Sequence, residues 1–338
     1  MNRILSACGL AAGAFLSCAA AQAAELNIYT YRQPELVKPV FDAFTAATGV
    51  KINTIFAAAG LEERIRTEGA ASPADILLVE DVGRLQNAVD LGIAQPIASP
   101  VLEKAIPANL RDPAGQWFAL SQRARVVYAS KARTKIDAIA YEDLADPKWK
   151  GKVCIRSGQH PYNVALIAAA IAHMGEEKTL EWLKGVKANL AKKPSGGDRD
   201  VAKDIAAGVC DIGVGNTYYM GGLLNETDPA KRAWGEAVQV VLPSFKGGGV
   251  NMNITGAIVA KNAPNKAEAV KFLEFMVGPE AQRLFADANY EYPVLAGVPV
   301  NPTVAAFGAL KPDTVSLGDV AKRRKAASEL VDVAGFDN

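Results

Sequence analysis

Residues 25–56 read ELNIYTYRQPELVKPVFDAFTAATGVKINTIF, and their pattern decides the fold class. Leu26–Thr30 is typical of a β-strand, and apolar residues then recur at helical spacing until Gly49, a residue type that commonly ends helices. Val50–Phe56 alternates between apolar and polar residues, as a second strand would. A strand, a helix and a strand in this order predict a parallel sheet that is covered by helices.

The same alternation continues along the chain. Further strands are expected at Ile76–Val79, Val153–Ile155, Ile212–Val214, Val238–Leu242 and Ile254–Ala260. Further helices are expected at Leu61–Glu68, Val82–Leu91, Tyr162–Met174, Glu176–Leu190, Lys266–Met276, Pro279–Asp287 and Val320–Val331. One more helix is expected after Gly196-Gly197, with Asp198 as its N-cap.

Two α/β lobes account best for this order of elements, each a mostly parallel sheet flanked by helices. Residues 24–125 and 255–338 would form the first lobe, and residues 126–254 the second. The chain would cross between the lobes at Val126–Ser130 and return at Ile254–Ala260. Because ligands of open parallel sheets bind beyond the carboxyl ends of the strands, we expect the ligand cleft between the lobes.

The first residues resemble an export signal. Arg3 is the only charged residue in 1–23, Ile4–Ala21 is apolar, and Ala21-Gln22-Ala23 fits a signal-peptidase site. We therefore expect a cleaved signal peptide at 1–23 and a periplasmic protein. An uncleaved membrane anchor and a lipidated cysteine are the alternatives.

Composition excludes several classes of function. Without Arg3, the basic and acidic side chains balance at 36 each, whereas a nucleic-acid partner would require a basic surface. The chain has two histidines and lacks the Gly-x-Ser-x-Gly and His-Glu-x-x-His motifs of common hydrolases. We therefore expect a monomeric binding protein, and neither an enzyme nor a nucleic-acid-binding protein.

Two adjacent tyrosines, Tyr218 and Tyr219, follow a predicted strand within the glycine-containing segment Gly215–Gly222. Few histidines and cysteines remain to bind zinc, copper or haem, whereas the hard ferric ion prefers anionic oxygen donors such as phenolates. Both side chains could reach one ion only from a turn or a first helical turn. The alternative is that one ring packs in the core and the other lines the rim of the cleft.

Other polar residues near strand ends are weaker candidates. Tyr162 lies between a predicted strand and a helix, at a cleft position or packed on its own lobe, and the adjacent His160 is either a ligand or solvated. Glu80 could donate an oxygen, although we expect Glu80 or Asp81 to cap the following helix.

Arginines near the strand ends suggest a small anion. Arg32, Arg123 and Arg125 could bind an oxyanion through the guanidinium fork, or form surface ion pairs. Because Arg123 and Arg125 alternate along a strand, only one of them should face the cleft. Cys154 and Cys210, on neighbouring predicted strands, are either a disulfide or two buried thiols.

Six motifs together resemble those of the periplasmic ferric-iron-binding proteins of bacterial iron-uptake ABC transporters, from about Glu25 to the C-terminus. The motifs are Tyr29-Thr-Tyr-Arg-Gln-Pro34, Ser72-Pro-Ala-Asp75, Arg123-Ala-Arg-Val-Val-Tyr128, Gly151-Lys-Val-Cys-Ile-Arg-Ser-Gly158, Gly196-Gly-Asp-Arg-Asp200 and Gly215-Asn-Thr-Tyr-Tyr219. The resemblance implies a type II periplasmic-binding fold and an inner-membrane ABC permease, with its ATPase, as partner.

For the site, the resemblance implies that Tyr162, Tyr218 and Tyr219 bind Fe(III). It also implies that a carbonate or bicarbonate ion is held by groups matching Arg32, Gln33 and Arg123. Other branches have a His-Tyr pair where this chain has Gln33 and Pro34, so those ligands are not expected here. The competing hypothesis is a protein of the same fold that binds a small organic anion, such as a phosphonate or a carboxylate.

Overall fold

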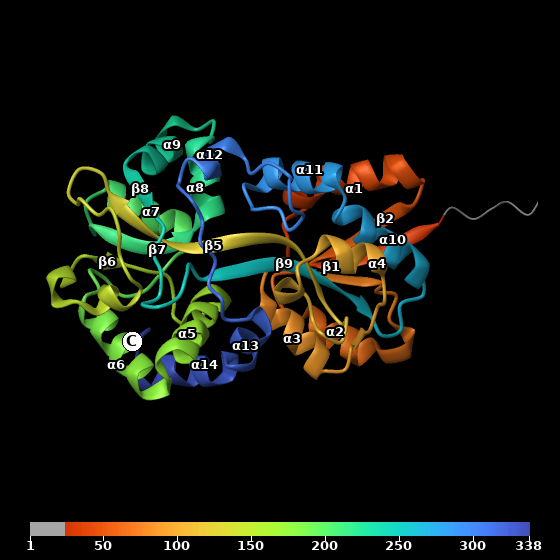
Figure 1. The fold of residues 1–338 in the computed structure, drawn as a ribbon, viewed down its shortest axis with the longest axis horizontal. Helices are drawn as coiled ribbons and strands as arrows, with labels where there is room; N and C mark the ends of the chain where they lie inside the picture. Colours follow the sequence, from red (N-terminus) through yellow and green to blue (C-terminus); the bar gives the residue numbers. More distant parts are fainter. Residues whose placement is uncertain (1–23) are drawn as a thin grey trace, which may run out of the picture.

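The computed structural model describes residues 24–338, so the predicted signal peptide at 1–23 lies outside the described residues. Two lobes lie side by side (Figure 1). The long strand β5 (Phe118–Ser130) runs from the first lobe into the second, and the chain returns at β9 (Met252–Ala260). This arrangement confirms the two-lobed α/β fold that the sequence predicts.

Most predicted elements lie close to where the structure has them, although several short strands and helices were not predicted. The other strands are β1 (Glu25–Thr30), β2 (Lys51–Phe56), β3 (Ile76–Val79), β4 (Ala94–Gln95), β6 (Val153–Cys154), β7 (Ile212–Asn216) and β8 (Val238–Val241). The helices of the first half are α1 (Pro34–Thr48), α2 (Leu61–Glu68), α3 (Val82–Asp90), α4 (Pro100–Ala105), α5 (Pro161–Met174) and α6 (Glu176–Ala188). The helices of the second half are α7 (Asp198–Ala206), α8 (Thr217–Leu224), α9 (Pro229–Glu236), α10 (Lys266–Met276), α11 (Pro279–Asn289), α12 (Pro302–Ala305), α13 (Leu317–Lys322) and α14 (Arg324–Val333).

Seven strands form one path in the order β2-β1-β3-β9-β5-β7-β6, while β4 pairs with β9 and β8 with β5 beside this path. Pairs at the two ends are parallel: β1 with β2 and β3, and β6 with β7. The other pairs are antiparallel, so the sheet is mixed rather than mostly parallel as predicted. The crossing strand β5 is antiparallel to its partners, pairing with β9 as far as Ala124 and with β7 from Arg125 onward. The crossing therefore lies between Ala124 and Arg125, just before the predicted segment Val126–Ser130.

Each lobe has its own hydrophobic core. In the first lobe, Phe44 on α1 packs edge-on against Phe272 and Phe275 on α10. Helices cover both faces of this sheet, with α1, α10 and α11 on one side and α2 and α3 on the other (Figure 1). In the second lobe, α5 and α6 pack on β6 and β7, and the disulfide Cys154–Cys210 joins β6 to the segment before β7.

The C-terminal helices pack differently from the expectation that all of 255–338 belongs to the first lobe. The single helix expected there is two helices that meet at Arg323. Leu317 on α13 joins the first core, whereas Val331 on α14 and Phe336 join the second. We therefore propose that α14 belongs to the second lobe and that α13 bridges the two.

Helix starts place polar residues at the junction of the lobes. Helix α1 begins at Pro34, directly after Gln33, and α5 begins at Pro161, because proline fits the first helical position. Helix α7 begins at Asp198 with Gly197 as its N-cap, so the expectation that Asp198 is the cap was wrong.

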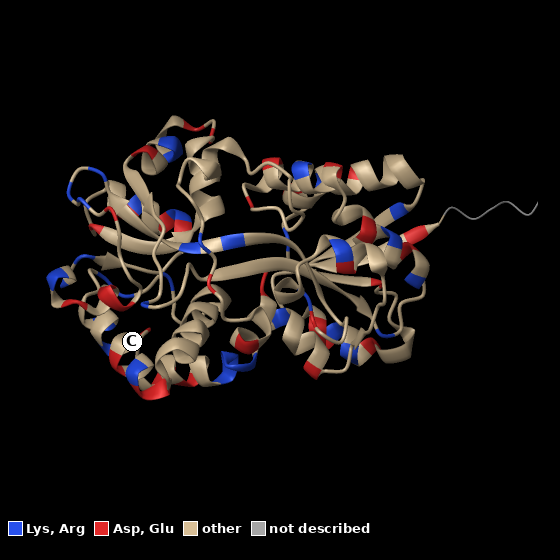
Figure 2. Cartoon of the chain, viewed as in Figure 1, with Lys and Arg blue, Asp and Glu red and all other residues tan. Residues whose placement is uncertain are grey.

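Charged residues of both signs are spread along the chain. Lysines, arginines, aspartates and glutamates are interspersed over both lobes, and two blue bands mark arginines in the middle of β5 (Figure 2). Among residues 24–338, no helix is both long and apolar enough to cross a membrane.

Candidate metal centre

A cavity of about 200 Å³ lies between the two lobes. The first lobe contributes Tyr31, Arg32, Gln33, Leu36, Glu80, Ala288, Asn289 and Tyr290. The second lobe contributes Tyr162, Arg199, Tyr218, Tyr219 and Gly222. All three tyrosines that the sequence singles out therefore line one cavity, together with Arg32 and Gln33.

The hydroxyl groups of Tyr162 and Tyr218 lie 3.2 Å apart. The rings of Tyr218 and Tyr219 are tilted, with centroids 4.1 Å apart. Tyr218 and Tyr219 occupy the first turn of α8, immediately after β7 ends, so the pair has left the strand geometry that would send the two rings to opposite faces. Tyr162 takes the corresponding place at the start of α5.

Burial and a nearby positive charge have opposite effects on the pKa values of the buried tyrosines. Burial raises the pKa of Tyr162 and Tyr218, because a buried phenolate loses its hydration. The positive charge of Arg123 pulls both pKa values back down. Guanidinium carbons of Arg123 and Arg156 lie 5.2 and 5.3 Å from the centroid of the Tyr162 ring, so two cations flank this phenol.

The Arg32 guanidinium makes its hydrogen bonds through one nitrogen, Nη1. Its Nη1 donates to Glu291 at 2.7 Å and to Thr255 at 3.3 Å, while its Nε and Nη2 have no hydrogen-bond partner within residues 24–338. Nε and Nη2 form the edge of a guanidinium that binds oxyanions in a bidentate manner. Arg32, which lines the cavity, therefore keeps a buried, unpartnered edge of the kind that binds oxyanions.

The two alternating arginines of β5 take different roles. Arg125 binds Asp198 at 2.5 Å and Asn163 at 2.7 Å, all inside the second lobe. Arg123 is fully buried beside the Tyr162 ring and does not line the cavity. Its Nη1 donates to Thr255 at 3.3 Å. Of the predicted anion-binding residues, Arg32 and Gln33 thus line the cavity and Arg123 does not.

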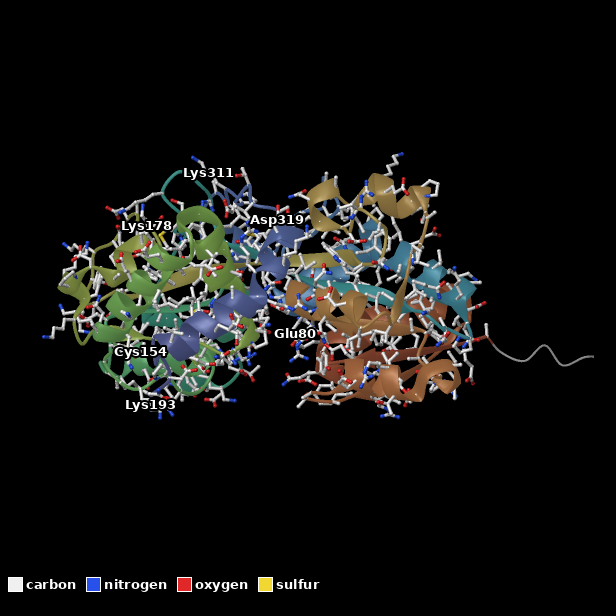
Figure 3. The ribbon with its side chains drawn as sticks, turned by 90° about the horizontal axis from the view of Figure 1, so that it is seen from below. Glu80, Cys154, Lys178, Lys193, Lys311 and Asp319 are labelled. Carbon is white, nitrogen blue, oxygen red and sulfur yellow. A yellow bond between two sulfur atoms is a disulfide. The ribbon has the colours of Figure 1, made fainter. Side chains whose placement is uncertain are left out.

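The remaining acidic candidates divide between the cavity and a helix cap. Asp81 caps α3 by accepting from the Gly83 backbone N–H at 2.8 Å, which confirms the expected cap in this region. Glu80 lies where the lobes meet (Figure 3), 3.9 Å from Arg84 and facing the cavity.

The two histidines are engaged within the protein. His160 accepts a hydrogen bond from the Tyr162 backbone N–H through Nδ1 at 3.3 Å. His173 pairs with Asp313 at 2.7 Å. No group of three or more His, Cys, Asp or Glu side chains that could hold a metal occurs in the described part of the chain. Among the residues that line this cavity, tyrosines are therefore the most numerous possible oxygen ligands.

Three residues in or beside the cavity were not identified as candidates from the sequence. Glu291 is completely buried beside Arg32, Tyr290 lines the cavity from a left-handed backbone conformation (φ 57°), and Arg199 lies over the Tyr219 ring at 4.8 Å. Glu291 and Tyr290 come from the irregular segment after α11, far from Arg32 in the sequence. The one available signal is a glutamate between two tyrosines directly after a helix, and this signal is weak.

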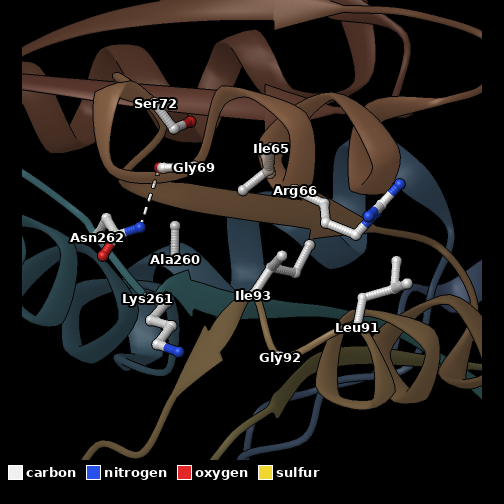
Figure 4. A pocket seen from close by; sticks show the side chains of 10 residues that line it. All are labelled: Ile65, Arg66, Gly69, Ser72, Leu91, Gly92, Ile93, Ala260, Lys261 and Asn262. Atoms are coloured by element: carbon white, nitrogen blue, oxygen red, sulfur yellow. Dashed lines mark hydrogen bonds between the residues drawn. The ribbon is translucent and has the colours of Figure 1, made fainter.

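A second hollow, of about 190 Å³, lies within the first lobe (Figure 4). Its lining combines aliphatic side chains such as Ile65 and Ile93 with Arg66 and Lys261. Across it, Asn262 donates to the Gly69 carbonyl at 2.9 Å. Its lining contains no tyrosine, so this hollow does not fit the predicted chemistry.

Comparisons with known proteins agree with the motifs. Residues 71–315 match the family of bacterial extracellular solute-binding proteins. Iron uptake protein A1 of Synechocystis sp. is 44% identical over 337 residues, an alignment that covers 99% of this chain and 94% of the relative.

Solved structures agree as well. A Bordetella ferric binding protein is 56% identical, with a TM-score of 0.87, and the match covers 93% of this chain and 100% of that one. A Trichodesmium protein in complex with iron and citrate ligands is 42% identical, with a TM-score of 0.88, covering 92% of this chain and 99% of that one. The chain therefore belongs to the bacterial extracellular solute-binding proteins, in the branch that contains the ferric-iron-binding proteins.

Proposed function

We propose that this protein binds one ferric ion through the phenolates of Tyr162, Tyr218 and Tyr219. The observation that carries the proposal is the meeting of these three rings in one cavity, with two hydroxyl groups 3.2 Å apart. Three phenolates balance the charge of Fe(III), and hard oxygen donors suit this ion. Relatives named for iron uptake and ferric-iron binding support the assignment.

A small anion completes the proposed site. Arg32 and Gln33 would hold carbonate or bicarbonate at the first-lobe wall, and Arg123 would add positive charge from beside Tyr162. The unpartnered Nε and Nη2 of Arg32, counted over residues 24–338, support this role.

The protein would act as a monomeric periplasmic carrier without catalytic activity. We propose that a signal peptide at 1–23 directs export and is cleaved. The loaded carrier would deliver iron to an inner-membrane ABC permease and its ATPase. Because the cavity takes residues from both lobes, closure around the ion would change the surface that the permease meets.

Titration with ferric citrate tests the metal site. We expect a visible phenolate-to-iron charge-transfer band that saturates at one iron per protein. Tyr219→Phe should weaken iron binding at least about 100-fold, since it removes a ligand outright. Tyr290→Phe is the matched control, because Tyr290 lines the same cavity and is not a proposed ligand. Unchanged iron affinity in Tyr219→Phe would refute the tyrosine site.

The alternative function is binding of a small organic anion, and the bidentate edge of Arg32 is the observation that favours it. In that case, a phosphonate or carboxylate would bind Arg32 directly and the tyrosines would only pack against it. Iron titration in the presence of bicarbonate separates the two functions. A folded protein without a charge-transfer band would support the organic anion.

A further inference from the structure

A buried cluster contains Arg32, Arg123 and a single carboxylate, that of Glu291. Glu291 is completely buried and accepts hydrogen bonds from Arg32 at 2.7 Å, from Thr255 at 3.0 Å, and from the Ser121 hydroxyl. The Thr255 hydroxyl in turn accepts from Nη1 of both arginines at 3.3 Å. The Thr255 hydroxyl thus contacts Nη1 of both guanidinium groups, whereas the Glu291 carboxylate binds Nη1 of Arg32 alone.

The hydrogen bonds of Nη1 determine which edge of the Arg32 guanidinium remains free to bind a ligand. With Nη1 engaged, the Nε and Nη2 groups of both arginines are left without a hydrogen-bond partner in residues 24–338, and of the two arginines Arg32 is the one that lines the cavity. Buried donors of this kind are rare because each unmade hydrogen bond costs free energy. An arrangement that leaves two of them on one edge of a cavity residue points to a ligand with at least two oxygen atoms.

The charge of the cluster restricts that ligand. Burial alone would raise the pKa of Glu291, but Arg32 and Arg123 hold the pKa below its ordinary value, so the carboxylate is ionised. Two guanidinium groups and one carboxylate carry a net charge of about +1. A singly charged anion neutralises this cluster, whereas a doubly charged anion leaves an excess negative charge in a buried place.

Neighbouring charges do not reverse this bias. Arg125 and Asp198 are both buried and pair with each other, so their charges cancel. Arg156, Glu80 and Arg199 are partly or fully exposed, and the solvent screens their charges. Asp81 is buried, and its charge is felt by Arg123, so any ionisation of Asp81 makes the surroundings more negative and disfavours a doubly charged ligand further.

From these contacts we propose that Glu291 is a positioning residue which orients Arg32 and restricts the anion subsite to singly charged oxyanions. The proposal rests on the anion subsite of the proposed function and assigns the charge class of its ligand. It does not depend on tyrosine ligation of iron, because Glu291 contacts only the first-lobe wall of the cavity.

Anion binding to the iron-free protein tests the proposal by calorimetry, with methanesulfonate and sulfate as probes. The two share a tetrahedral oxygen face but carry one and two charges, and neither changes protonation near neutral pH. The wild-type protein should bind methanesulfonate more tightly than sulfate. Glu291→Gln should shift this preference toward sulfate by roughly tenfold, because one buried negative charge is lost.

Two variants serve as controls. Glu291→Asp keeps the charge and should keep the preference for methanesulfonate, even where both affinities fall. Asp75→Asn removes a completely buried carboxylate that binds Asn27 and Asn265 rather than an arginine, and should leave the preference unchanged.

Tighter binding of sulfate by the wild-type protein would overturn the proposal, even if Glu291→Gln does not fold. An unchanged preference in a folded Glu291→Gln variant would also overturn it. Because iron is absent, neither result bears on the charge-transfer titration, and failure of that titration leaves this test intact.

Discussion

At the scale of single residues, burial of the tyrosine side chains disfavours the phenolate form that metal binding requires. The pKa values of Tyr162 and Tyr218 lie above that of a free phenol because burial destabilises the phenolate. Both residues are therefore phenols in the metal-free protein at neutral pH, and each must release a proton on binding Fe(III). Acid should weaken iron binding, and the flanking Arg123 and Arg156 limit how costly deprotonation is.

His160 offers a pH-dependent prediction at the same scale. Burial, followed by the positive charges of Arg156 and Arg125, lowers its pKa to about 3, whereas an unfolded histidine titrates near 6.5. As the pH falls from 6.5 toward 3, the unfolded chain takes up a proton that the folded chain does not. Stability should therefore fall with falling pH, by at most about 1.4 kcal/mol per pH unit from this residue.

The variant His160→Asn isolates this contribution, because asparagine can also cap α5. Urea unfolding between pH 4 and 7 should show a shallower loss of stability in the variant than in the wild type. Parallel curves would show that His160 does not titrate as its surroundings indicate. At pH 7 we expect an unchanged charge-transfer band, since Nδ1 already faces the Tyr162 backbone.

The candidate residues differ in how far the sequence could reveal them. Tyr218 and Tyr219 are found because two adjacent phenols beside glycines are unusual in a chain with two histidines. Glu291 is not found, because its role depends on contact with Arg32, 259 residues away, and a lone glutamate carries no periodic signal. Local sequence patterns can thus indicate candidate ligands, whereas a buried ion pair between residues far apart in the sequence becomes evident only in the structure.

At the element scale, α8 begins where β7 ends and meets the segment after α11. A Cβ at Gly221 would lie 2.5 Å from the Cβ of Tyr290, closer than side chains approach. Tyr290 itself ends α11 in the left-handed conformation, which is strained for a residue other than glycine. The absent side chain at Gly221 thus permits a contact between the lobes beside the tyrosine pair.

Gly221→Ala should destabilise the protein by about 1–3 kcal/mol through overpacking against Tyr290. Gly222→Ala is the matched control: its Cβ would approach no atom closer than 4.0 Å, so alanine should be neutral or stabilising by up to about 1 kcal/mol. Urea unfolding measures both. The double variant Gly221→Ala/Tyr290→Gly should recover stability, and equal effects of the two alanines would contradict the contact.

Elements with a clear period were predicted nearly to the residue, as for α2, β3 and α10. The antiparallel crossing of β5 and β9 was not, because a buried strand looks the same in either direction. The C-terminal helices were assigned to one lobe for a similar reason. Their apolar faces show that they pack, but the pattern does not tell which core receives Leu317 and which receives Val331.

At the scale of the whole molecule, the chain crosses between the two lobes at β5 and returns at β9. Strand β5 changes partners between Ala124 and Arg125, so the backbone there connects the strands of one lobe to those of the other. The proposed metal ligands all come from the second lobe, whereas Arg32 and Gln33 come from the first. Iron alone would thus bind one lobe, and the anion would connect it to the other.

A ligand shifts a conformational equilibrium only by contacts that differ between the two states. Iron with bicarbonate should therefore make the wild-type protein more compact in small-angle X-ray scattering. In Arg32→Gln, a weakened charge-transfer band should remain while the compaction is lost, because the tyrosines still bind iron but the first lobe no longer binds the anion. Tyr219→Phe should lose both signals. Full compaction in Arg32→Gln would mean that the tyrosine-bound iron itself recruits the first lobe, and that the anion is not the link between the lobes.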